Sequence, residues 1–391
     1  MNKIESFYAD FLLNRENQDL KRDLVDVTHP SNKEIAVNGQ QYINFSSNDY
    51  LGLKNHPLLI ERSKQWAEKY GTGSGASRLV TGNLEVFSSL EKKVATFKQK
   101  EDALIMVSGF QANASVLPAL FDSKVLGQEP LIFSDKLNHA SMHLGCRASG
   151  ISQIRYRHND MEHLEELLEK NKNSTAAKFI LTESVFSMDG DIAPLEKIKD
   201  LAIHYNCFTI VDEAHATGVL GQNGQGLATE ADLVIGTFSK AFGTFGAYIA
   251  CTKMLKDYLI NKCSGLIYAT ALPPAILGSI DAALDLVPTM NKERALLQNM
   301  AQNFRNEISV IGFGTENSQT QIIPMIIGDS SKALNMSHKL KEKGLWATAI
   351  RPPTVPPNSS RIRFTFSAAH TENDLDKLLN ALTALEKKQA I

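Results

Sequence analysis

Short apolar runs alternate with amphipathic helical segments between about residues 57 and 285, and this pattern constrains the fold more than any other feature. In the segment 194–205, for example, Leu195, Ile198 and Leu201 recur at helical spacing on one face. Such helices between short apolar runs predict βαβ units and a mostly parallel sheet that is buried on both faces. The expected strands are 103–107, 131–133, 179–181, 208–211 and 233–235.

The chain on either side of this region predicts two further parts. A polar, amphipathic helix is expected at about 7–24, followed by a short strand at 42–45. Beyond a break near Pro288, we expect helices at 291–309 and 372–387 and strands at 322–327, 345–350 and 361–366. The predicted organisation is an N-terminal arm (1–50), a large α/β domain (51–287) and a smaller C-terminal α+β domain (288–391).

Composition and charge exclude several classes of protein. The formal net charge of the 391-residue chain is −2, so no basic surplus points to nucleic acid. No stretch approaches about 18 consecutive apolar residues, so no membrane span is expected. The acidic residues Glu5, Asp10 and Glu16 are atypical of a signal or transit peptide, which favours a cytoplasmic protein.

The four cysteines, at positions 146, 207, 251 and 263, have no CxxC spacing. We therefore expect reduced, mostly buried thiols of the kind found in cytosolic proteins. A zinc site would need clustered ligands, which this sequence does not offer, so no metal is expected.

Polar residues follow each predicted strand. Ligands of open parallel sheets bind beyond the carboxyl ends of the strands, so these residues are candidates for one site. After the first strand, the segment 108–113 is a small-residue turn into a helical pattern, which suits an anion because free backbone N–H groups and the positive helix dipole face it. The other four strands are followed by His139 (after Ser134 and Asp135), by Glu183 and Ser184, by Asp212 and His215, and by Thr237 and Lys240.

This set of residues matches the requirements of pyridoxal phosphate (PLP). Lys240 lies in a small-residue turn between apolar segments, where desolvation favours a neutral, nucleophilic amine. A buried Asp212 carboxylate would need a cation, which the protonated pyridine nitrogen of PLP supplies. Taken singly, Asp212 is explained by a helix cap, His139 or His215 by a structural histidine and Lys240 by a surface lysine. The hypothesis therefore rests on their order and their shared position at strand ends.

A glycine pattern at 71–76 is a weaker candidate for a ligand site. GTGSGA contains GxGxxA, but a dinucleotide fingerprint must follow a strand, whereas the preceding segment 58–70 has helical periodicity. We therefore interpret it as a flexible loop that lines a pocket, or simply as a turn. No GxxxxGK[ST] motif supports an ATP-binding P-loop.

Eight segments resemble the α-oxoamine synthases, a PLP-dependent family of fold-type I. They are NFSSNDYLGL (44–53), GTGSGASRLVTGN (71–83), SGFQAN (108–113), NHAS (138–141), ESVFSMDGDIAPL (183–195), VDEAHATGVLG (211–221), GTFSKAFG (236–243) and IRFTFSAAHT (362–371). The resemblance extends over essentially the whole chain. It implies the α/β transferase fold of that type, in which a large domain with a mostly parallel sheet is joined to a smaller C-terminal α+β domain.

The resemblance implies cofactor roles for the residues at the strand ends. Lys240 would hold PLP as a Schiff base, Asp212 would pair with the pyridine nitrogen, and His139 would stack on the ring. His215 and Ser184 would reach the ring hydroxyl region. The phosphate side would be served by Gly109, Phe110 (where relatives often have Tyr), Thr237 and, from a second subunit, Thr270.

Substrate contacts follow from the same resemblance. Asn48 and Arg361 would contact the substrate carboxylate, and Thr354 and Arg22 would contact the acyl substrate. The family members are homodimers whose active sites lie at the subunit interface.

The segments GLIYATALPP (265–274) and PTVPPNSSRIRFTFSAAH (353–370) favour one activity within the family. The predicted reaction condenses L-alanine with a pimeloyl thioester, on CoA or on acyl carrier protein, and releases CO2 and the free thiol. Lys240 would remove the Cα proton, and His139 could hydrogen-bond the thioester oxygen. The alternatives are a sister synthase that uses glycine, serine or another acyl-CoA, a PLP-dependent aminotransferase or decarboxylase, and a non-catalytic protein on the same fold.

Overall fold

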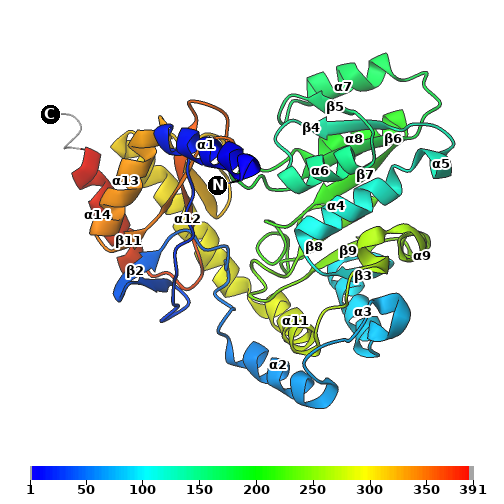
Figure 1. Ribbon diagram of the computed structural model, residues 1–391, viewed down its shortest axis with the longest axis horizontal. Coiled ribbons are helices and arrows are strands. Elements are labelled where there is room, and N and C mark those ends of the chain that lie inside the picture. The colour runs from blue at the N-terminus through cyan, green and yellow to red at the C-terminus, as the bar shows by residue number, and fades with distance from the viewer. Residues whose placement is uncertain (1, 387–391) are drawn as a thin grey trace. The chain divides into compact units, whose positions relative to one another are not determined.

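The computed structural model describes residues 2–386, which form two compact units (Figure 1). Unit 2 comprises Asp49–Ser187 and Asp191–Ala295. Unit 1 comprises the chain up to Asn48, the segment Met188–Gly190 and the chain from Leu296 onward. The three-part division expected from the sequence stays a prediction.

The core of unit 2 is a seven-stranded sheet in the order β3–β9–β8–β7–β6–β4–β5. Strand β9 runs antiparallel to both of its neighbours, whereas all other neighbouring pairs are parallel. All strands except β9 therefore point the same way, which confirms the predicted mostly parallel sheet. The bounds are β3 (Asp102–Met106), β4 (Leu131–Asp135), β5 (Gln153–Tyr156), β6 (Lys178–Glu183), β7 (Cys207–Asp212), β8 (Leu233–Thr237) and β9 (Ala247–Cys251).

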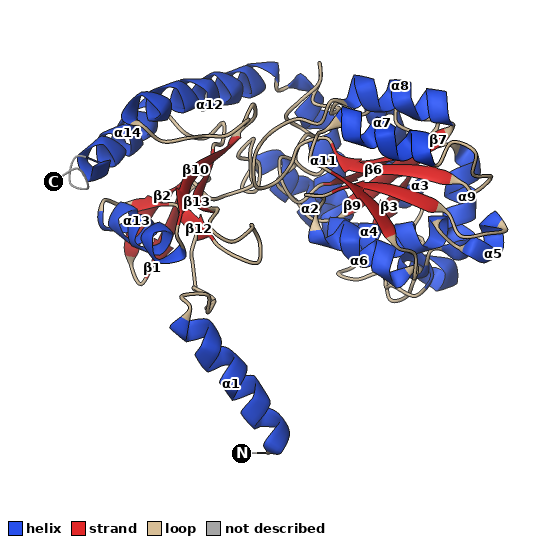
Figure 2. Ribbon diagram, turned by 90° about the horizontal axis from the view of Figure 1, so that it is seen from above, coloured by secondary structure: helices blue, strands red, loops and turns tan. Residues whose placement is uncertain are grey.

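Helices cover both faces of this sheet. Phe179 and Leu181 of β6 pack into an apolar cluster with residues of α4 and α6, whereas Ile180, between them, packs with residues of α7 and α8. Figure 2 shows α4 and α6 on one side of the strands and α7 and α8 on the other. Because successive strand residues point to opposite faces, a continuous apolar run is what a sheet buried on both sides requires.

The helices of unit 2 confirm the predicted alternation with strands. The segment predicted as helical at 194–205 forms α8, in which Ile198 and Ala202 are buried. The bounds are α2 (Pro57–Tyr70), α3 (Val86–Lys98), α4 (Gly109–Leu120), α5 (Ser123–Leu126), α6 (Ala140–Ala148), α7 (Met161–Lys170), α8 (Leu195–Tyr205), α9 (Lys253–Lys262), α10 (Ser264–Ile267) and α11 (Pro274–Leu286), with a π-turn at Arg78–Gly82 and a 3₁₀ turn at Val287–Thr289.

In the unit 2 sheet, the five predicted strands correspond to β3, β4, β6, β7 and β8, and two strands of this sheet, β5 and β9, were not predicted. The sequence of β5, QIRY, is too polar to stand out because β5 lies at the edge of the sheet. Strand β9 follows directly on the apolar segment that surrounds Lys240, so its start has no contrast in hydrophobicity.

Unit 1 contains two three-stranded sheets, β1–β2–β11 and β10–β13–β12. The predicted strand 345–350 is interrupted at Ala347, and its two halves pair in different sheets. Helix α12 begins in unit 2 and continues into unit 1. The bounds are α1 (Lys3–Asn17), β1 (Glu34–Val37), β2 (Gln40–Asn44), α12 (Asn291–Ile311), β10 (Ile322–Gly328), α13 (Ser330–Glu342), β11 (Leu345–Trp346), β12 (Thr348–Ile350), β13 (Ser360–Thr365) and α14 (Glu372–Glu386).

The prediction of a helix at 7–24 was wrong in its bounds. The helix begins at Lys3, where Asn2 and Glu5 form a capping box, and it ends at Asn17. Asp19 has a φ of 55°, which a right-handed helix cannot continue. The predicted end of the final helix, residue 387, lies outside the described residues.

Among residues 2–386, no helix has both the length and the apolar character needed to cross a membrane. The cysteines are free thiols: Cys146, Cys251 and Cys263 are buried, and Cys207 is half-buried.

Candidate active site

Residues from the ends of five strands meet at one edge of the unit 2 sheet. Strands β3, β4, β6, β7 and β8 point the same way, so the residues that follow them lie at a common edge. The structure therefore brings the predicted cofactor residues that follow these strands to one edge of the unit 2 sheet, as expected for a sheet of this type.

Asp212, at the end of β7, is buried among donors. Its Oδ2 accepts a hydrogen bond of 2.7 Å from Asn113 Nδ2, and its Oδ1 accepts one of 2.8 Å from the Ala214 N–H. Its main-chain carbonyl accepts the Ser184 N–H at 2.8 Å, which ties β6 to β7 beyond the sheet. Two donors thus fix the Asp212 carboxylate, and a third fixes its main chain.

The first turn of α4 is suited to binding an anion. The Ser108 side chain caps the helix by accepting the Gln111 N–H, while the N–H groups of Gly109 and Phe110 have no carbonyl partner within the helix. A Cβ atom on Gly109 would lie 3.7 Å from the Cβ of Thr237, so the helix start lies beside the end of β8. Main-chain donors and a hydroxyl group therefore face the same small region.

Lys240 lies in a tight turn after β8. Thr237 Oγ1 donates to the Gly246 carbonyl at 2.8 Å and lies 2.7 Å from Ser239 Oγ, and the Gly243 N–H donates to the Lys240 carbonyl at 2.9 Å. Gly243 has a φ of +64°, and a Cβ there would come within 2.5 Å of the main chain at Leu53. The turn can form only with glycine at this position, and the Lys240 side chain is left half-buried.

His139 caps α6 at the end of β4. Its Nδ1 lies 2.7 Å from Ser141 Oγ and accepts the Ser141 N–H at 3.3 Å. Loss of hydration lowers the pKa of His139, the Asp212 carboxylate opposes this change, and the Lys240 ammonium group reinforces it. His139 is therefore mainly neutral at pH 7 and lies within electrostatic range of both Asp212 and Lys240.

His215 and Glu183 complete this edge of the sheet. His215 is buried, and its Nδ1 lies 2.7 Å from the hydroxyl oxygen of Tyr50. Glu183 is also buried; desolvation and the Asp212 carboxylate raise its pKa well above the usual value. Its Oε1 is among the buried atoms that find no hydrogen-bond partner within residues 2–386. Sequence reasoning gave Glu183 no role.

Lys98 forms a buried ion pair with Glu213, the residue that follows Asp212, and sequence reasoning missed this pair. Both side chains are fully buried, and Glu213 also accepts the N–H groups of Leu227 and Ala228. The signal was present, because Lys98 continues the apolar face of α3 formed by Phe87 and Leu90. Adjacent carboxylates in one turn thus have different surroundings: Asp212 faces the other site residues, and Glu213 holds the turn in place.

Four predicted substrate residues, Arg22, Asn48, Thr354 and Arg361, lie in unit 1, whereas His139, also expected to contact the substrate, lies in unit 2. Arg361 is buried, and its guanidinium group forms a 2.5 Å ion pair with Asp189 and bonds to the carbonyl of Ser359. The Asn48 side-chain oxygen accepts hydrogen bonds of 3.3 and 3.4 Å from Arg363. These two residues have protein partners, and their contact with substrate stays a prediction.

Arg22 and Thr354 do lie together, 2.9 Å apart, although 332 residues separate them in the sequence. Arg351 lies near them: its guanidinium group binds the carbonyls of Asp19 and Lys21, and the charge of Arg22 contributes to lowering its pKa, after desolvation. Sequence reasoning missed Arg351, although it stands only three residues before Thr354. The result is a cationic cluster with a hydroxyl group, suited to an anionic substrate.

Thr270 and the glycine segment 71–76 are neighbours in unit 2. Thr270 is exposed and bridges Ser77 in an antiparallel contact, and the Ala271 N–H donates to the Ala76 carbonyl at 3.0 Å. The segment follows α2 rather than a strand, which confirms that it is not a dinucleotide fingerprint.

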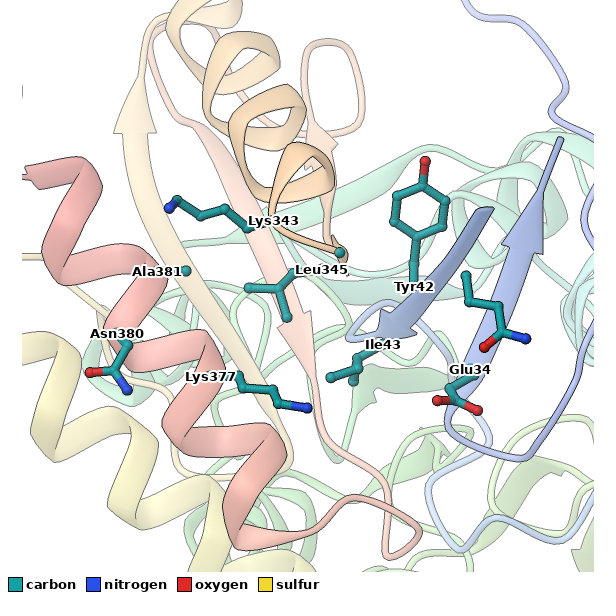
Figure 3. A pocket seen from close by; sticks show the side chains of 10 residues that line it. Glu34, Tyr42, Ile43, Lys343, Leu345, Lys377, Asn380 and Ala381 are labelled. Carbon is teal, nitrogen blue, oxygen red and sulfur yellow. The ribbon is translucent and has the colours of Figure 1, made fainter. Parts of the chain in front are cut away.

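A separate surface hollow of about 510 Å³ in unit 1 contains none of the predicted site residues. Figure 3 shows its side chains, with Lys343 and Lys377 pointing in different directions rather than toward a common point. This arrangement offers no chemistry comparable to that of the strand ends.

The residues at the strand ends of unit 2 fit pyridoxal phosphate. The buried Asp212 oxygens could accept a hydrogen bond from a protonated ring nitrogen, and the amine of the half-buried Lys240 could form a Schiff base with the aldehyde of the cofactor. The first turn of α4, together with Thr237, is suited to binding a phosphate group. The orphaned Glu183 oxygen also indicates that this region is arranged around a polar group that the protein alone does not supply.

Comparisons with known proteins agree with this geometry. The family model described as Aminotransferase class I and II matches residues 40–382. The 8-amino-7-oxononanoate synthase of Gluconacetobacter diazotrophicus is 48% identical over an alignment of 396 residues that covers 100% of both proteins.

Two solved structures are similar over most of the chain. A serine palmitoyltransferase from S. paucimobilis with a bound PLP–myriocin aldimine has a TM-score of 0.91 and 25% identity and covers 99% of both chains. An 8-amino-7-oxononanoate synthase from Francisella tularensis has a TM-score of 0.76 and 28% identity and covers 90% of this chain and 99% of that one.

Proposed function

Because the chain belongs to the aminotransferase class I and II family and, within it, to the α-oxoamine synthases, we propose that it catalyses the reaction of 8-amino-7-oxononanoate synthase. In this reaction L-alanine condenses with a pimeloyl thioester, and CO2 and the free thiol are released. The observation that carries the proposal is 48% identity over full length to a synthase of that name, combined with an intact set of strand-end residues. The reaction belongs to biotin biosynthesis.

The cofactor is pyridoxal 5'-phosphate, which acts as an electron sink when bound. We propose that Lys240 holds it covalently and, once released, moves the proton at the substrate Cα. The fixed Asp212 carboxylate would keep the ring nitrogen protonated, and the first turn of α4 would bind the phosphate together with Thr237. Ser184 and His215 would orient the ring hydroxyl, and Thr270 would contribute from a second subunit.

His139 has a distinct role in this proposal. Its neutral ring would stack on the cofactor and could donate a hydrogen bond to the thioester oxygen as negative charge develops there. The lowered pKa supports this role, because a neutral ring avoids repulsion with the ammonium form of Lys240. An N–H aimed at an atom that gains charge stabilises the transition state more than the ground state.

Both proposed substrates carry a carboxylate, and unit 1 offers two places for one. Arg361 and Asn48 are the residues expected from the family resemblance, and Arg22 and Thr354 are those expected for the acyl substrate. The structure adds Arg351, which lies close to Arg22. A bidentate arginine contact would give orientation as well as affinity.

The proposal is tested by incubating the PLP-loaded protein with pimeloyl-CoA and L-alanine, glycine or L-serine in turn, and measuring thiol release and product mass. Thiol release that requires L-alanine, together with formation of 8-amino-7-oxononanoate, supports the proposal. Pimeloyl acyl carrier protein in place of pimeloyl-CoA then identifies the thioester. A protein that shows no turnover with either thioester would contradict the proposed function.

A sister activity is the second candidate, because the serine palmitoyltransferase structure matches with the higher TM-score, 0.91 against 0.76. That likeness concerns the backbone, whereas sequence identity over full length favours the alanine-using enzyme. Preferential thiol release with L-serine or glycine in the same assay would move the assignment to the sister activity.

We also propose that the protein is a cytoplasmic homodimer. Helix α1 buries none of its residues, and Phe7, Tyr8 and Phe11 each expose more than 60% of their surface. Apolar exposure of this extent is typical of an interaction surface. Light scattering that gives the mass of two chains would support the proposal, and a monomeric mass at micromolar concentration would contradict it.

A further inference from the structure

His158 lies between two buried carboxylates of unit 2. Its Nδ1 is 3.0 Å from Asp135 Oδ1, and its Nε2 is 2.8 Å from Asp191 Oδ2. The side chains of Asp135 and Asp191 are 0% and 6% exposed. Asn159 strengthens the bridge, because its N–H donates to Asp135 Oδ2 at 2.9 Å and its side-chain amide donates to Asp191 Oδ2 at 2.7 Å.

The bridge joins two segments that are far apart in the sequence. Asp135 ends β4, and its Oδ1 also accepts the Leu137 N–H at 2.8 Å, which shapes the short loop that leads to His139. This loop therefore has its start fixed by His158 and its end fixed by the cap of α6. Any movement of Asp135 would be transmitted to His139 over only four residues.

Asp191 belongs to a hairpin that begins at Ser184. Val185 pairs with Ile192, the Phe186 N–H donates to the Asp191 carbonyl at 3.1 Å, and the Ala193 N–H donates to the Ser184 carbonyl at 3.1 Å. The Phe186 ring also lies edge-on to the imidazole, with the ring centroids 4.4 Å apart. The hairpin thus holds Asp191 and Ser184 in a fixed position relative to each other.

The His158 ring carries the charge that this arrangement requires. Burial alone would lower its pKa, but the hydrogen bonds and charges of Asp135 and Asp191 raise it to about 10. Two carboxylates buried together without a cation would repel each other and lose hydration, so a neutral side chain could not hold them in the same way.

We propose that His158 is a positioning residue: it clamps the β4–α6 loop, which carries His139, to the hairpin that starts at Ser184, and so fixes the two side chains relative to each other for the cofactor. The inference rests on the proposed cofactor roles of His139 and Ser184. His158 itself acts through Asp135 and Asp191 and is not a catalytic residue.

The experiment compares His158→Gln with His143→Gln in the full-length protein. His143 is the matched control, because it is also a half-buried histidine of unit 2 but has a neutral partner, Gln153, at 2.8 Å. Hydrogen exchange is measured without PLP, followed by PLP binding from its visible absorbance and by steady-state kinetics. Asp191→Asn is the second variant, because it weakens only the hairpin side and stays informative if His158→Gln does not fold.

We expect faster exchange in the loop and in the hairpin for His158→Gln, faster exchange in the hairpin alone for Asp191→Asn, and no local change for His143→Gln. A misplaced His139 and Ser184 should lower kcat by about 10- to 100-fold with a smaller change in the KM for the amino acid. Exchange and PLP binding in His158→Gln that match the His143→Gln control would overturn the inference.

The two proposals can fail separately. A wild-type protein that does not bind PLP would overturn the proposed function, whereas the exchange data would still show whether His158 joins the two segments. If the wild-type protein binds PLP and the His158→Gln variant has unchanged kinetics, only the positioning role of His158 would be contradicted.

Discussion

Asp212 in unit 2 and the predicted acyl-substrate residues Arg22 and Thr354 in unit 1 are held in different ways. In unit 2, Asp212 ends a central strand, is buried and has hydrogen bonds on both carboxylate oxygens. In unit 1, Arg22 and Thr354 are exposed, lie outside helices and strands, and bond to each other. Regular structure thus fixes one group of side chains, and irregular segments hold the other.

This difference is consistent with the proposed roles of the two groups of residues. Bond-making at a cofactor requires atoms fixed within a fraction of an ångström, which strand ends provide. Recognition of a flexible acyl chain tolerates adjustment, and residues on loops can supply it. Substitutions in unit 2 should therefore change cofactor binding and kcat, whereas substitutions at the exposed residues of unit 1 should change KM.

The largest effect is expected for Lys240→Ala. The substitution removes the amine that we propose attaches the cofactor and moves the Cα proton, so kcat should fall by roughly 10³-fold or more. Steady-state thiol release measures the effect. Lys253→Ala is the control, because Lys253 is an exposed lysine paired with Asp257. Normal turnover by Lys240→Ala would end the proposed assignment of roles.

Asp212→Asn should have the next largest effect. The substitution keeps the shape of the side chain but removes the charge that we propose pairs with the ring nitrogen, and a hydrogen bond to a charged group contributes about 1.5–3 kcal/mol. We expect PLP affinity or kcat to fall by about 10- to 100-fold, measured by absorbance titration and turnover.

A substitution of the adjacent residue, Glu213, should have a contrasting effect. Glu213→Gln leaves Lys98 buried without its charged partner, which typically costs about 3–5 kcal/mol of stability. Its urea midpoint should fall more than that of Asp212→Asn, although Glu213 does not face the cofactor residues. Equal effects of the two variants on stability and on PLP binding would contradict the separate roles.

A smaller effect is expected at the arginines of unit 1. Arg351 binds main-chain carbonyls, whereas the charge of Arg361 is balanced by Asp189. Arg351→Ala should therefore raise the KM of one substrate by about tenfold, and Arg361→Ala should mainly lower the melting temperature. A larger rise in KM for Arg361→Ala would instead support the contact expected from the family resemblance.

The smallest effect at neutral pH concerns His370, in the core of unit 1. Desolvation lowers the pKa of His370 from 6.5 to about 4. Because the folded pKa is the lower one, the contribution to stability is complete above about pH 6.5 and declines as the pH falls toward 4, by up to about 3 kcal/mol. His370→Asn should lose less stability than the wild type between pH 7.5 and 4.5, as measured by urea unfolding.

The contribution of His158 in unit 2 to stability should depend on pH in the opposite direction. Its folded pKa is raised to about 10, so its contribution is complete below about pH 6.5 and declines as the pH rises toward 10. If the contributions of His370 and His158 to stability both declined as the pH falls, or both declined as the pH rises, the electrostatic contrast between the two regions would be wrong.

The sequence was most informative where one physical rule acts locally. The apolar runs predicted five strands of the unit 2 sheet. The rule that ligands bind at the carboxyl ends of such strands predicted that Asp212, His139 and Lys240 lie at one edge. The edge strand β5 was missed because its exposed side leaves no continuous apolar run. The early end of α1 was missed because the left-handed conformation of Asp19 has no clear signal in its neighbours.

Partners that meet only in three dimensions were harder to predict. His158 has carboxylate partners 23 and 33 residues away, and Lys98 has one 115 residues away. A histidine taken alone is usually explained as a structural residue and a lysine taken alone as a surface residue, so neither stood out. Arg351 was overlooked for a similar reason, because the loop around Thr354 has no periodicity to place it.

The most direct test of the central claim is to locate the cofactor on the chain. Reducing the PLP-loaded protein with borohydride fixes the cofactor to the lysine that holds it, and peptide mass spectrometry then identifies that lysine. We predict a single modified peptide that contains Lys240. Modification of a different lysine, or no modification of a protein that has been incubated with PLP, would contradict it.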